Sequence, residues 1–139
     1  MKDSEDWWTA PAEADNGSLI MVTGRGDVRK FRDNPRFSIR VEVSWPYGSG
    51  MPDEEQSEMM GTATDRFSEI LDKDPVAVMT GIFTGDGVRT WVFYTLSTNI
   101  FNKKLNEAFD PLPTLPLEIT AENDPHWEAY DEMAEFEVK

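Results

Sequence analysis

The chain has 139 residues and a formal net charge of −14, with 27 acidic side chains against 13 lysines and arginines. This length suits one domain, and a content of 39% hydrophobic and 12% aromatic residues is enough for a folded core. The charge argues against nucleic acid or an anionic membrane as a partner, because like charges repel. The absence of cysteine excludes disulfides, thiolate metal sites and a cysteine nucleophile.

The amino-terminal residues 1–17 are predicted to be an acidic tail that precedes the domain. The tail contains adjacent tryptophans, Trp7 and Trp8, and ends in the turn dipeptide Asn16-Gly17. Because a packed aromatic side chain buries about 150–250 Å², we expect at least one tryptophan to dock on the domain; the alternative is an exposed patch for a partner. No apolar run approaches the roughly twenty residues that span a bilayer, so a cytoplasmic protein is expected, provided that no leader has been removed.

Two strands are predicted in the first third of the chain. Residues 18–23 form a short apolar run, and residues 37–45 alternate apolar and polar side chains with the period of a strand that has one buried face. The second strand ends at Trp45-Pro46-Tyr47, because proline has no N–H to donate to a sheet.

The charges of two segments are opposite. Residues 25–40 hold six basic and two acidic side chains, whereas residues 116–139 hold eight acidic side chains and one lysine. We expect the two segments to neutralise each other. The alternative is that the basic segment forms a patch that binds phosphate or acidic groups.

Helices and strands alternate in the rest of the chain. A helix is predicted to begin at Pro52 and to end at residues 72–75, and the runs 76–84 and 88–96 form a hairpin around Gly85-Asp86-Gly87. The strand 88–96 is expected to be central and covered on both faces. A helix over 100–109, a proline-rich connector at 110–113, an edge strand over 115–120 and a final helix from Asp124-Pro125 complete the chain.

This order of elements predicts an α+β fold. The elements from the second strand to the last strand match a ferredoxin-like βαββαβ arrangement, with one antiparallel sheet and two helices on one face. An extra N-terminal strand and a C-terminal helix are added to it. We expect a single domain over residues 18–139.

Several short motifs, in a fixed order and spacing, carry a resemblance to a known family. They are Pro35, Trp45-Pro46-Tyr47, Gly50-Met51-Pro52, Thr84-Gly85-Asp86-Gly87-Val88-Arg89 with Phe93-Tyr94, and Asp124-Pro125-His126-Trp127-Glu128-Ala129-Tyr130. From about Ser18 onward, the chain resembles the bacterial family catalogued as domain of unknown function family 695. The resemblance implies a ferredoxin-like domain and no established activity. More distantly, the chain is similar to the regulator of ribonuclease E activity B family, whose acidic ferredoxin-like proteins bind an enzyme rather than catalyse a reaction.

His126 is the only histidine, so any histidine-based general acid/base chemistry depends on it. Asp124 and Glu128 flank it, and these three are the candidate catalytic residues of a small hydrolase or transferase with His126 as general base. In that reading Arg36 and Arg40 would bind an anionic substrate. The simpler interpretation is a surface histidine in the first turn of a helix. A single imidazole among local carboxylates predicts no metal site, and no cofactor motif is present.

The leading hypothesis is a non-catalytic regulatory or interaction module. It would present an acidic surface, with a groove edged by the C-terminal helix, to a protein with a basic surface. The expected binding residues are Trp127, Tyr130, Glu128, Asp131, Glu132, Arg36 and Arg40. The Trp127/Tyr130 pair is also consistent with pinning the last helix to the domain. A small-molecule site in the aromatic interior is a further alternative, and pairing of sheet edges would allow a homodimer.

Overall fold

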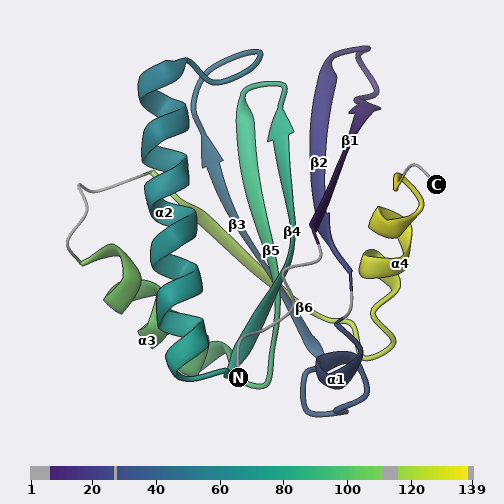
Figure 1. Ribbon diagram of the computed structural model, residues 1–139, viewed down its shortest axis with the longest axis vertical. Coiled ribbons are helices and arrows are strands. Elements are labelled where there is room, and N and C mark those ends of the chain that lie inside the picture. Colours follow the sequence, from purple (N-terminus) through teal and green to yellow (C-terminus); the bar gives the residue numbers. More distant parts are fainter. Residues whose placement is uncertain (1–6, 27, 111–115, 138–139) are drawn as a thin grey trace.

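Six antiparallel strands form one sheet in the computed structural model, which describes residues 7–26, 28–110 and 116–137 (Figure 1). The strand order is β1-β2-β4-β5-β3-β6. The strands are β1 (Trp7–Glu13), β2 (Leu19–Arg25), β3 (Ile39–Pro46), β4 (Ala77–Gly85), β5 (Val88–Thr95) and β6 (Glu118–Asn123). The helices of these residues are α1 (Arg29–Arg32), α2 (Glu54–Lys73), α3 (Thr98–Phe109) and α4 (Glu128–Ala134). The α+β class and the antiparallel sheet are as predicted.

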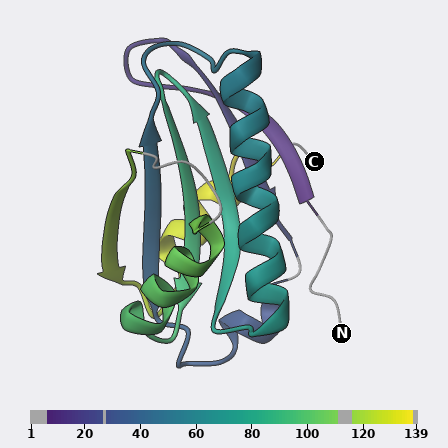
Figure 2. The same cartoon turned by 90° about the vertical axis from the view of Figure 1, so that its left-hand side faces the viewer.

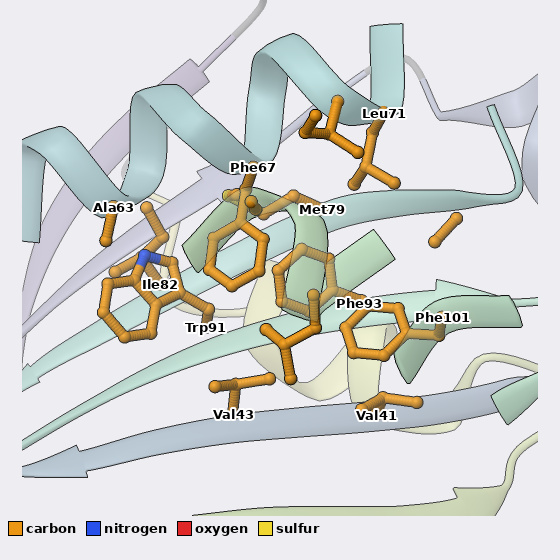
Figure 3. Close-up of a cluster of buried hydrophobic side chains, with 14 of the residues drawn as sticks. Val41, Val43, Ala63, Phe67, Leu71, Met79, Ile82, Trp91, Phe93 and Phe101 are labelled. Atoms are coloured by element: carbon orange, nitrogen blue, oxygen red, sulfur yellow. The ribbon is translucent and has the colours of Figure 1, made fainter. Parts of the chain in front are cut away.

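Helices α2 and α3 cover one face of the sheet and enclose the larger core (Figure 2). Aromatic rings meet here: Phe67 of α2 lies 4.8 Å from Phe93 of β5, which lies 4.9 Å from Phe101 of α3, between ring centroids. Figure 3 shows these rings side by side above Val41 and Val43 of β3. The apolar residues that recur at helical spacing in α2 and α3 therefore face the sheet and pack into this core.

A second, smaller core lies on the opposite face, where α1 and α4 pack. It contains Val28, Phe31, Phe37, Val78, Tyr94 and Trp127. Strand β5 contributes to both cores, with Trp91 and Phe93 on one side and Tyr94 on the other, so its prediction as a central strand covered on both faces is confirmed.

The amino-terminal segment differs from the expected tail, because residues 7–13 form edge strand β1. Asn16-Gly17 closes a hairpin with β2, in which Gly17 has a φ of +86°. The ring of Trp8 covers Gly24 of β2 so closely that a Cβ atom there would overlap it. Trp7 is 38% exposed. Residues 1–6 of the expected tail lie outside the described residues, as do residues 111–113 of the predicted connector.

The carboxyl-terminal elements begin later than predicted. Strand β6 occupies 118–123 instead of 115–120, at the sheet edge beside β3. Helix α4 begins at Glu128 rather than at Asp124, because Asp124 pairs with Ser38 through its N–H and thereby extends the ladder of β3 and β6. Trp127 then turns the chain with a left-handed φ of +57°. None of the described helices is both long and apolar enough to cross a membrane.

Candidate functional site

A groove of about 340 Å³ lies between α4 and the sheet. Its apolar side chains come from three elements, Phe83 of β4, Val92 of β5 and Met133 of α4, and Phe136 follows that helix. The other lining residues are Arg40, Glu42, Thr80, Thr90, Ala129, Tyr130 and Glu132. The groove thus combines an apolar surface with carboxylates from β3 and α4.

Strand β4 sets the position of α4 over the sheet. The register of β4 with β5 shifts between Met79 and Gly81, which leaves Thr80 as a bulge residue. Met133 of α4 packs directly on Gly81, where the sulfur occupies the space of a missing side chain. Helix α4 contacts β2 and β4, and residues of the neighbouring strands β5 and β3 form the rest of the groove lining.

Buried aromatic residues hold the start of α4. Trp127 has no exposed surface, its indole N–H donates to the carbonyl of Phe37 at 2.8 Å, and its ring stacks on Tyr94 at 4.0 Å between centroids. The hydroxyl of Tyr130 donates to the carbonyl of Arg25 at 2.7 Å. These contacts fix α4 against β2, β5 and the loop before β3.

Asp124 connects β6 to α4 through its buried carboxylate. The hydroxyl of Tyr94 donates to Oδ2 at 2.6 Å, and the backbone N–H groups of Glu128 and Ala129 donate to Oδ1 and Oδ2 at 3.0 and 3.1 Å. Burial favours a higher pKa for Asp124, but these hydrogen bonds and the charge of Arg40 outweigh it and lower the pKa. Burial and the adjacent carboxylate raise the pKa of Tyr94, which keeps its proton as the donor.

The basic and acidic segments neutralise each other in part, as predicted. Arg32 forms a bidentate ion pair with Asp131, with both N–O distances at 2.7 Å, and Arg40 contacts Glu122 at 2.7 Å. The hydrogen bond to Asp131 raises the pKa of Arg32, and the same bond lowers the pKa of Asp131. Arg40 also lies 3.2 Å from Glu42, so its charge is shared between two carboxylates.

An acidic surface persists on α4 after these ion pairs form. Glu128, Glu132 and Glu135 are exposed, and Glu132 borders the groove. Phe136 is 44% exposed beside them. The expected acidic binding residues therefore fall into two groups: Glu128 and Glu132 face solvent, whereas Asp131 is engaged by Arg32.

The structure brings together some of the other predicted site residues and separates the rest. Tyr130 and Arg40 line the groove, whereas Trp127 is a core residue and cannot contact a partner in this conformation. This corrects its assignment to the binding surface, and the reason is its stacking on Tyr94. Arg36 is exposed on the loop between α1 and β3 and is not part of the groove.

The candidate catalytic residues do not converge on one another. Both carboxylate oxygens of Asp124 accept hydrogen bonds from other groups, so Asp124 is not free to orient His126. His126 is exposed, and its carbonyl accepts a hydrogen bond from Arg32 at 3.0 Å. Within the described ranges, no three histidine or acidic side chains are grouped so that they would hold a metal ion.

Sequence reasoning missed the apolar part of the groove. Phe83 and Val92 lie in runs that read as buried strands, and only their position opposite Met133 makes them groove residues. The ion pair of Arg32 with Asp131 was foreseeable as a contact between segments, but not as a specific pair.

The comparisons with known proteins agree with the resemblance found in the motifs. The model of a family of unknown function (DUF695) matches residues 6–133, and the chain belongs to this family. No curated protein and no solved structure matches the chain.

Proposed function

We propose that this protein is a non-catalytic interaction module that binds a protein with a basic surface through α4 and the groove beside it. The observation that carries the proposal is the groove itself, in which Phe83, Val92 and Met133 lie next to the exposed carboxylate of Glu132. A partner that inserts an apolar side chain and places lysine or arginine at the rim would complement both features.

Charge supports the same type of partner. The net charge of −14 attracts a basic protein over distances that extend to about 8 Å at physiological salt. Exposed Glu128, Glu132 and Glu135 concentrate negative charge on one helix. The association should therefore become slower as salt is added.

We also propose that the inner elements form a ferredoxin-like unit. The order β4-β5-β3-β6 supports this, because β3 and β4, which precede and follow α2, lie on either side of β5. The packing of α2 and α3 on one face agrees with it. In this description β1 and β2 extend the sheet beyond β4, and α4 covers the face opposite α2.

A small-molecule site is a second candidate, and it is favoured by one observation. The groove volume of about 340 Å³ lies at the lower end of the roughly 300–1,000 Å³ typical of ligand pockets. A small ligand with an apolar body and one positively charged group would suit the same lining, because the groove combines apolar side chains with the carboxylate of Glu132. Thermal unfolding in the presence of a panel of such compounds would reveal it as a ligand-dependent rise in Tm.

The test of the interaction proposal is affinity capture from a lysate of the source organism at low and high salt. The decisive variant reverses three exposed charges of α4, Glu128→Lys, Glu132→Lys and Glu135→Lys. Asp131 is left unchanged because its loss would break the ion pair with Arg32 and disturb the fold.

The matched control makes the same change of charge on α2, with Glu55→Lys, Glu58→Lys and Asp65→Lys, three exposed positions. We expect one stoichiometric partner that the wild type and the α2 variant capture at low salt and that the α4 variant does not. Equal loss of capture in both variants would show that net charge alone is responsible, and undiminished capture by the α4 variant would likewise contradict a site on α4.

A further inference from the structure

Among the residues that the structure describes, β6 is the last strand on its side of the sheet, so the backbone groups along its outer edge have no strand partner there. The N–H of Asp124 donates to the carbonyl of Ser38, which precedes β3. Successive residues of a strand direct their backbone N–H and C=O groups to opposite edges of that strand. Therefore Glu118, Thr120 and Glu122 direct their backbone groups toward β3. Those of Ile119, Ala121 and Asn123 point away from the sheet.

The opposite edge of the sheet is protected in a way that β6 is not. In the hairpin of β1 and β2, the N–H of Ala14 donates to Ser18, so the same alternation places the backbone of Pro11 on the outer edge of β1. Proline removes a donor from that edge, which is a common means of preventing strand addition. Strand β6, with the sequence EITAEN, contains no proline.

A groove of about 490 Å³ runs between β6 and α3, directly beside this free edge. Ile119 and Ala121 form its β6 side, and Ile119 is 45% exposed. The remaining lining residues are Val41, Thr98, Asn102, Leu105, Asn106 and Thr120, so the lining carries no charge. A strand added to β6 would direct every second side chain toward this groove.

The two faces of the added strand would contact different kinds of side chain, uncharged on one face and partly acidic on the other. Side chains opposite Ile119 and Ala121 would enter the uncharged groove, whereas the intervening side chains would lie on the side of Glu118, Thr120 and Glu122. Glu122 is already paired with Arg40, but Glu118 has no ion pair among those that the described residues form. The complementary segment therefore alternates apolar and basic residues.

A second copy of the chain fits this edge poorly. In an antiparallel pairing centred on Ala121, Glu118 of each copy would lie opposite Asp124 of the other, and each copy carries a net charge of −14. Like charges directly opposite one another destabilise a strand pair. Charge thus favours a basic segment of a different protein over self-association.

We propose that the outer edge of β6, with the α3 groove beside it, is a strand-addition site for an extended peptide segment in which apolar and basic residues alternate. The uncharged groove of this site is separate from the α4 surface, since α3 and α4 lie on opposite faces of the sheet (Figures 1 and 2), whereas the basic side chains of the segment would lie on the face of Glu118 and Glu122. Backbone hydrogen bonds along β6 would provide affinity, and the alternation of side chains would provide specificity.

The probe is a blocked peptide, acetyl-Lys-Val-Lys-Val-Lys-Val-Lys-amide, titrated against the full chain and followed by two-dimensional NMR. We expect saturable binding with slower amide exchange at Ile119, Ala121 and Asn123. Two modified peptides test the geometry. In an antiparallel pairing with β6, the orientation that all paired strands of this sheet adopt, N-methylation of the valines removes the donors that face β6 and should abolish binding, whereas N-methylation of the lysines modifies the far edge and should preserve it.

The protein variant is Ala121→Pro, which removes an outward N–H without removing a hydrogen bond to β3. We expect the affinity for the peptide to fall by about tenfold or more, because one donor is lost and the ring obstructs the edge. Ala121→Val retains the donor but also enlarges a groove side chain, so its affinity for the peptide should fall less than that of Ala121→Pro. If Ala121→Pro does not fold, the pair of N-methylated peptides still decides the question with the wild-type chain.

Three results with the wild-type chain and Ala121→Pro would overturn the proposal: no binding of the peptide, equal binding of the two N-methylated peptides, or a dimer of the chain that Ala121→Pro dissociates. The α4 charge-reversal variant separates this site from the proposed function, and it should bind the peptide within about threefold of the wild type. Loss of peptide binding in that variant alone would place the peptide in the α4 groove and would contradict strand addition at β6.

Discussion

Two neighbouring residues, Asp124 and Trp127, determine how the carboxyl-terminal helix attaches to the sheet. The Asp124 carboxylate receives one side-chain and two backbone hydrogen bonds, and the Trp127 ring fills the core between Tyr94 and Phe37. Both residues belong to the motif that carries the family resemblance. Their contacts give that motif the role of a structural lock.

The first prediction concerns the Trp127 side chain. Trp127→Phe removes the donor to the Phe37 carbonyl and should lower the free energy of unfolding by about 1–3 kcal/mol, whereas Trp127→Ala should cost about 3–5 kcal/mol. Urea unfolding measures both. Trp7→Ala, at a partly exposed position, is the control and should cost less than Trp127→Ala; equal costs would argue against the lock.

The second prediction concerns the pH dependence of the same site. Because the folded-state pKa of Asp124 is below its usual 3.8, its stabilisation is present above that value and is lost as the pH falls through the lower folded-state pKa. Asp124→Asn should therefore be less stable than the wild type at neutral pH, and the difference should shrink in acid. Denaturant titrations between neutral pH and about pH 2 test this.

A suitable control is Asp65→Asn, an exposed carboxylate on α2. It should change the unfolding free energy little at either pH. A difference between wild type and Asp124→Asn that stays constant down to the lowest pH would show that the carboxylate charge does not stabilise this turn.

At the level of elements, the sequence predicted the parts whose signals are local. Helix α2 begins at Glu54, two residues after the predicted start at Pro52, with Asp53 and Gln56 in a capping box, and the Gly85-Asp86-Gly87 hairpin joins β4 to β5 as predicted. Strand β1 was missed because its sequence resembles a tail, and it becomes a strand only through pairing with β2. The starts of β6 and α4 were misplaced because pairing with β3 overrides the local preference at Asp124.

The third prediction tests how α4 sits on β4. Gly81→Ala places a methyl group where the Met133 sulfur lies, so α4 must shift. We therefore expect the free energy of unfolding to fall by about 1–3 kcal/mol and amide exchange in α4 to become faster. Gly61→Ala is the matched control, since its Cβ atom on α2 meets no neighbour within 4 Å. That control should stabilise the chain by up to about 1 kcal/mol.

At the scale of the whole molecule, the distribution of charge was partly predictable and the groove was not. Opposite charge in the two segments predicted their contact, which Arg32–Asp131 and Arg40–Glu122 provide. The groove depends on the strand order, on the bulge at Thr80 and on the glycine beneath Met133. None of these is visible in hydrophobic periodicity, because they arise from contacts between residues far apart in the chain.

The net charge of −14 has a further consequence for any partner. Most acidic side chains of the described residues outside the ion pairs face solvent, so long-range electrostatics would favour a basic partner over a second copy of the chain. The α4 surface adds a local apolar groove to this general attraction. Specific recognition would come from the groove, and the rate of encounter from the charge.

The most direct test of the α4 surface is the association rate constant between the captured partner and three forms of the chain, measured at low and high salt. We predict a fast, salt-sensitive association for the wild type and for the α2 charge-reversal variant, and a rate lower by about tenfold or more for the α4 variant at low salt. Identical rate constants for the α2 and α4 variants would contradict the assignment of the binding surface to α4.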